Sequence, residues 1–171
     1  MMVKIASSKT DMAAIAGIEG LRDIGGDASA KAILKVLDKT LKAKEPSVQV
    51  YSACLKSVGV IASEDGKVVK ALSKLLKNKL YDVTGKAAQA MAGYKDASGK
   101  LRKELLEEVI KSSEGVYNAA QANDQNSKRK WNIIQNGIMK ALKALSGQTF
   151  KNPAEARGWY NDNKKNRALW K

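Results

Sequence analysis

Histidine is absent from this sequence of 171 residues, and cysteine occurs only once. Without histidine there is no Ser-His or Cys-His pair, no imidazole general base and no ordinary zinc or copper site. Cys54 has no second cysteine with which to form an internal disulfide or a redox pair, so cysteine content does not report the compartment. These absences exclude several classes of chemistry, and we expect a protein that is not an enzyme, with no catalytic residue, no cofactor and no metal.

Long apolar runs are also missing. No stretch of about 18 consecutive apolar residues occurs, which excludes a transmembrane helix. Residues 1–10 contain no apolar stretch of signal-peptide length, and we expect them to form a flexible N-terminal tail. The compartment stays open: cytoplasmic as the sequence is written, exported or periplasmic if a leader has been removed. The oligomeric state stays open as well.

Acidic residues are few in comparison with basic ones. The chain has 31 Lys and Arg against 17 Asp and Glu, which gives a net charge of +14, and its length suggests one domain. Such a charge favours acidic partners, namely nucleic acid, anionic lipid head groups or acidic proteins.

Proline is scarce, and alternating strand patterns are absent. The two prolines lie outside the long periodic stretches, and Ala, Leu and Lys are abundant, which favours helices. Apolar residues recur at three- and four-residue steps, as in Ile134, Ile138 and Leu142. The pattern predicts an all-α domain over residues 11–171.

The segment 20–46 is repeated at 54–80 and, more weakly, at 90–112. Leu37, Leu72 and Leu106 occupy equivalent places, 35 and 34 residues apart. We expect repeats at about 11–46, 47–80, 81–127 and 128–150, followed by a cap at 151–171. First helices are predicted at about 11–24, 47–62, 82–95 and 128–145, second helices at about 28–43, 65–79 and 99–112, and a short cap helix at about 153–163. The polar stretch 112–127 is predicted to be either a long loop or a frayed helical extension.

These features resemble HEAT repeats, in which Leu-x-x-(Ile/Val)-Gly closes the first helix of each hairpin. The first two copies read Leu21, Ile24, Gly25 and Leu55, Val58, Gly59, whereas the third and fourth depart from this pattern. The ending "ALSGQTFKNPAEARGWYNDNK" also looks like the tail of bacterial HEAT-repeat proteins. The resemblance implies a right-handed α-solenoid of about four hairpins with a short C-terminal capping helix. It further implies that second helices line a concave side, and that the surface binds other proteins.

Positive charge is concentrated in two places. The segments 27–44, 64–80 and 98–112 carry +3, +3 and +1, and residues 128–171 carry +9. Lysines at helical spacing form a stripe on the second helices. We therefore predict a scaffold that binds an acidic protein partner through the following lysines: Lys35, Lys39, Lys42, Lys70, Lys74, Lys77 and Lys111.

Three other interpretations stay open. The stripe could serve solubility only, or it could bind polyanions without sequence specificity, either nucleic acid or an anionic membrane surface. The chain is also similar to HEAT-like DNA glycosylases in repeat type and charge, but only Asp162 lies near an aromatic residue in the basic region. In the cap, a set of cationic and aromatic residues forms either a binding corner or the seal of the last apolar layer: Arg157, Trp159, Tyr160, Arg167 and Trp170.

Overall fold

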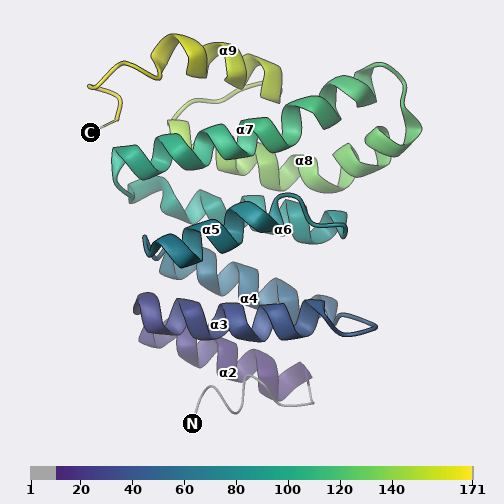
Figure 1. The fold of residues 1–171 in the computed structure, drawn as a ribbon, viewed down its shortest axis with the longest axis vertical. Coiled ribbons are helices and arrows are strands. Elements are labelled where there is room, and N and C mark those ends of the chain that lie inside the picture. Colours follow the sequence, from purple (N-terminus) through teal and green to yellow (C-terminus); the bar gives the residue numbers. More distant parts are fainter. Residues whose placement is uncertain (1–10, 171) are drawn as a thin grey trace.

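Helices form nearly all of the regular structure in this computed structural model, which describes residues 11–170 (Figure 1). No strand occurs within these residues, so the all-α prediction is confirmed. The predicted tail 1–10 lies outside the described residues. The helices are α2 (Asp11–Ile24), α3 (Gly26–Leu41), α4 (Val48–Ile61), α5 (Gly66–Leu75), α6 (Tyr81–Met91), the 3₁₀ helix η1 (Ala92–Asp96), α7 (Gly99–Gln121), α8 (Gln125–Ser146) and α9 (Pro153–Asn163).

Local capping signals set several of these helix ends. The Asp65 side chain accepts a hydrogen bond from the amide of Lys67 at 2.9 Å and begins α5. Asn152 caps α9 in the same way, with Pro153 in the first turn, as the sequence predicts. Gly147 ends α8 with φ +74°, a left-handed conformation that glycine adopts without steric cost.

The polar stretch 112–127 is helical over most of its length, so its interpretation as a long loop is wrong and the helical extension holds. α7 continues to Gln121, and α8 begins four residues later. The extension has a packing partner, because the rings of Tyr117 and Trp131 meet edge to face at 5.3 Å between centroids. A short turn suffices because Asn123 adopts φ +68° and Asp124 caps α8.

The helices lie in two layers (Figure 1). Along the first layer α2 packs on α4, α4 on α6 and α6 on α8, while in the second layer α3 packs on α5 and α7 on α9. Backbones approach closely in the first layer: a Cβ atom at Gly93 on η1 would lie 1.8 Å from the carbonyl oxygen of Gly59 on α4. That the second helices line a concave side, as the resemblance implies, stays a prediction.

Between the layers runs one apolar core. Leu37, Leu72 and Leu106, which the repeat places at equivalent positions, are all buried. Helices that are far apart in the sequence therefore contribute to the same core.

Polar contacts link the starts of helices that are far apart in the sequence. Ser63 donates to Asp27 Oδ1 at 2.6 Å, and the backbone amide of Ser98 donates to Glu64 at 3.0 Å. These partners are separated by 36 and 34 residues in the chain, which is close to the spacing of the repeat that the sequence predicts. The starts of α3, α5 and α7 are thus linked to one another.

Candidate functional site

Five of the seven predicted partner-binding lysines are exposed without an ion pair. Their side chains project from α3, from α5 and from the turn that follows α5, and none forms a salt bridge with another residue of the described chain: Lys35, Lys39, Lys70, Lys74 and Lys77. The charges of this group are therefore available to a partner, and we call it the lysine face.

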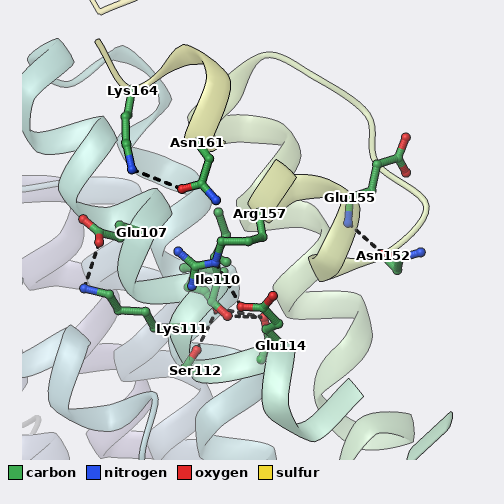
Figure 2. Close-up of polar contacts among 12 residues, drawn as sticks. Glu107, Ile110, Lys111, Ser112, Glu114, Asn152, Glu155, Arg157, Asn161 and Lys164 are labelled. Atoms are coloured by element: carbon green, nitrogen blue, oxygen red, sulfur yellow. Dashed lines mark hydrogen bonds and ion pairs between the residues drawn. The ribbon is translucent and has the colours of Figure 1, made fainter. Parts of the chain in front are cut away.

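The two remaining predicted lysines already have acidic partners within their own helices. Lys42 Nζ lies 2.7 Å from Asp38 Oδ2, and Lys111 Nζ lies 2.9 Å from Glu107 Oε1 (Figure 2). Lys31, which the sequence does not single out, bonds Asp65 across the two helices at 2.6 Å. That bond raises the pKa of Lys31 and lowers the pKa of Asp65.

An apolar groove of about 230 Å³ runs between α3 and α5 beside these lysines. Four of its lining residues are leucines, and Ala71 adds a fifth apolar side chain. Its polar lining consists of Asp38, Lys74 and Asn78. The leucines are Leu34, Leu37, Leu41 and Leu75; all but Leu37 are only partly buried. The groove therefore offers apolar surface at the edge of a cationic one, and we call it the leucine groove.

The lysine face ends at the boundary between α5 and α7. Here Lys70 shares a cavity of about 360 Å³ with Glu64 and Glu104, so the charges are mixed. Lys111, which the sequence predicts to continue the lysine stripe onto α7, has its Nζ atom at Glu107 (Figure 2). The predicted lysines without an ion pair therefore lie on α3, on α5 and in the turn that follows α5.

Of the predicted cap residues, Arg157, Trp159 and Tyr160 lie on α9 and have partners within the fold. The ring of Trp159 packs between Phe150 and Trp170, with centroid distances of 5.8 and 6.1 Å. Arg157 Nε donates to Glu114 Oε2 at 2.9 Å (Figure 2). This arrangement is what an apolar seal requires, since aromatic rings cover the last layer and the cation is neutralised.

Tyr160 joins the cap to α7 through a carboxylate. Its hydroxyl donates to Glu107 Oε2 at 2.9 Å, while Lys111 holds the other oxygen. These two hydrogen bonds, that from Lys111 first, lower the pKa of Glu107. Burial, followed by the bond to the carboxylate, raises the pKa of Tyr160 to about 12. Tyr160 is therefore a structural link between two helices.

Arg167 and Trp170 occupy a different place from the other cap residues. They line a cavity at the first turn of α7 together with Gly99 and four lysines that sequence reasoning does not select: Lys100, Lys103, Lys164 and Lys165. Residues 100–103 and 164–167 are both rich in cations, but nothing in the sequence indicates that two segments so far apart in the chain meet in the fold.

The other chemically suggestive residues have ordinary surroundings. Cys54 is fully buried, and burial raises the pKa of its thiol to about 12. Asp162, the candidate for glycosylase chemistry, is exposed on α9. Within residues 11–170 no group of three or more His, Cys, Asp or Glu side chains is placed to hold a metal ion. None of the helices in the same range is both long and apolar enough to cross a bilayer.

Comparison of the chain with protein-family models, with curated proteins and with solved structures finds no significant match.

Proposed function

We propose that this protein is a non-enzymatic scaffold of HEAT-like helical hairpins that binds an acidic, partly apolar segment of another protein along α3 and α5. The observation that carries the proposal is the leucine groove beside five lysines without ion pairs. An acidic segment complements that charge, and apolar side chains of the same segment fill the groove.

The repeat architecture supports this proposal. Helices alternate between two layers, and partners 34 and 36 residues apart join neighbouring hairpins. Such stacks present long regular surfaces whose main use is to bind other proteins. The proposal rests on the exposure of the lysines and on the groove, and it does not require that the second helices form a concave side.

The free energies of the two kinds of contact indicate different roles for the leucine groove and the lysine face. Full burial of one leucine side chain contributes about 1.5 to 3 kcal/mol, whereas an exposed ion pair contributes about 0 to 1 kcal/mol. The groove therefore supplies most of the affinity, while the lysines select acidic partners and accelerate their association. A protein segment satisfies both requirements better than a nucleic acid does, because the groove is apolar and the lysine face contains neither arginine nor an aromatic ring for base recognition.

The test is a fluorescence anisotropy titration with a labelled peptide of alternating glutamate and leucine blocks, designed as an amphipathic helix. The wild-type protein is expected to bind it, and Lys35→Glu combined with Lys74→Glu is expected to weaken binding about tenfold or more. Ala71→Glu, which places a charge in the groove, is expected to abolish binding because a carboxylate would be desolvated there.

Lys56→Glu combined with Lys95→Glu is the matched control, since both lysines are exposed and lie outside α3 and α5. This control is expected to bind within about twofold of the wild-type protein. If the control lost as much affinity for the peptide as the α3 and α5 variants, net charge alone would explain the binding, and the proposal would be contradicted. A peptide in which serine replaces every leucine and that binds equally well would contradict the role of the groove.

A further inference from the structure

A basic cavity lies where the C-terminal segment folds back over the first turn of α7. Its volume is about 780 Å³, and it is lined by Gly99, Trp170 and five cationic residues: Lys100, Lys103, Lys164, Lys165 and Arg167. None of its described lining residues carries a carboxylate, and none of the five cations forms a salt bridge with another described residue. Among the described residues this charge is therefore not neutralised, unlike that of Lys111 and Arg157, which bind Glu107 and Glu114.

Specific contacts of the chain hold the cavity in shape. Trp170 Nε1 donates to the carbonyl oxygen of Asn163 at 3.0 Å, and its ring packs against Trp159. Lys103 Nζ donates to the carbonyl oxygen of Lys164 at 3.3 Å, which ties α7 to the end of α9. The backbone of Trp170 passes so close to Gly99 that a Cβ atom there would lie 1.8 Å from its carbonyl oxygen. The C-terminal segment is therefore fitted to α7, with the cations brought together from both.

We propose that this cavity binds a compact oligophosphate, either free or as part of a nucleotide. Five cations around one space repel one another, and a ligand with several negative charges relieves that repulsion. Lysine ammonium groups bind phosphate oxygens as point charges, and Arg167 adds a planar donor pair. The volume of about 780 Å³ is in the range of ordinary small-molecule sites.

The arrangement favours recognition of phosphate over recognition of a base. The only aromatic ring of the cavity belongs to Trp170, and it already packs edge to face on Trp159 with the Arg102 guanidinium 6.0 Å from its centroid. A nucleobase would have to compete with these contacts. Triphosphate groups are therefore expected to set the affinity, with little contribution from the rest of a nucleotide.

Isothermal titration calorimetry with sodium tripolyphosphate at about 50 mM salt tests the proposal under conditions that strengthen such contacts. The wild-type protein is expected to bind one tripolyphosphate, and ATP is expected to bind with an affinity within about tenfold of it. Inorganic monophosphate is expected to bind at least tenfold more weakly. Lys100→Gln and Lys165→Gln are each expected to weaken tripolyphosphate about tenfold, the cost of one charge-assisted contact.

Two further variants separate the cavity from net charge. Lys35→Gln and Lys39→Gln remove the same charge from the lysine face and are expected to leave tripolyphosphate binding within about twofold. Gly99→Ala changes no charge but displaces the segment around Trp170, so it is expected to weaken binding while circular dichroism stays unchanged.

Either of two results would overturn the proposal: no heat with tripolyphosphate, or equal losses in the Lys35 and Lys100 variants. Binding of duplex DNA without binding of tripolyphosphate would assign the charge to a nucleic-acid backbone and would also contradict it. The lysine face is not part of this cavity, so the peptide titration and the tripolyphosphate titration test the two proposals independently.

Discussion

Tyr160 illustrates how single side chains attach the C-terminal cap to the rest of the protein. Its hydroxyl donates to Glu107, and Glu107 also accepts from Lys111. Tyr160→Phe keeps the ring but leaves one carboxylate oxygen without this donor. We expect the free energy of unfolding to fall by about 1.5 to 3 kcal/mol, measured by urea denaturation, because hydrogen bonds to charged groups contribute about that much.

Tyr117→Phe is the control for this variant, since the Tyr117 ring packs on Trp131 but its hydroxyl has no hydrogen-bond partner among the described residues. It should leave the stability within about 0.5 kcal/mol of the wild type, the usual range for neutral substitutions. A Tyr160→Phe protein as stable as the control would show that the bond contributes nothing to the fold.

The same pair of residues predicts the pH dependence of stability. The pKa of Tyr160 is raised to about 12, so above pH 10 the unfolded chain loses a proton that the folded chain keeps, and stability falls as the pH rises from about 10 to 12. The pKa of Glu107 is lowered, so its contribution is present above the ordinary glutamate pKa and is lost as acid titrates the folded protein. Urea unfolding at alkaline pH should show a smaller decline for Tyr160→Phe, and identical slopes for both proteins would contradict the assignment.

Cys54 gives a second prediction at this scale. Because burial raises its pKa to about 12, the thiol is expected to resist iodoacetamide in the native protein at pH 8 and to react on addition of denaturant. Mass spectrometry measures the extent of alkylation with and without denaturant. Rapid alkylation of native protein would contradict the buried position of α4 side chains in the core.

Helix packing in the first layer depends on small residues at the contact points. A Cβ atom at Gly137 on α8 would lie 1.9 Å from the carbonyl oxygen of Gly85 on α6, so the two helices would have to separate. We expect Gly137→Ala to lower the free energy of unfolding by about 1 to 3 kcal/mol, the usual cost of overpacking.

Gly115→Ala makes the same chemical change in α7. There the added Cβ atom would have no neighbour within 4 Å apart from the backbone of its own helix. There the gain in helix propensity should stabilise the protein by up to about 1 kcal/mol. Differential scanning calorimetry of the two variants compares their melting temperatures. If both variants shift in the same direction, the close approach of α6 and α8 is not a constraint on the fold.

At the level of elements, the sequence predicts helix position far better than helix length at the hairpin tips. Apolar residues at helical spacing place most of the predicted helices, and Asn152, Pro153 and Gly147 mark the start of α9 and the end of α8 correctly. The stretch 112–127 is too polar to be assigned from hydrophobic period, because its helicity depends on packing of α7 against α8. That tertiary contact has no signature within one segment.

Considered as a whole, the molecule has two basic surfaces with different surroundings. On α3 and α5 the exposure of the predicted lysines follows from their spacing, whereas the apolar groove beside them is not predicted from the sequence. Around the cap, prediction selects Arg167 and Trp170 but misses Lys100, Lys103, Lys164 and Lys165, because the cavity exists only where the C-terminal segment meets α7. Contacts between distant segments therefore decide which cations share a site.

The two surfaces also differ in what neutralises the charges beside them. Glu104, Glu107, Glu108 and Glu114 lie on α7, and two of these carboxylates hold Lys111 and Arg157. The net charge of +14 is thus not spread evenly over the protein. A partner that needs both apolar contact and positive charge is expected on α3 and α5.

An amide NMR titration with the glutamate and leucine peptide tests this claim most directly, because it reports the contact surface residue by residue. We expect chemical-shift changes to concentrate on α3 and α5 around Leu41, Lys74 and Leu75, and to disappear in Ala71→Glu. Shift changes confined to the first-layer helices or to the cavity around Trp170, with α3 and α5 unaffected, would contradict it.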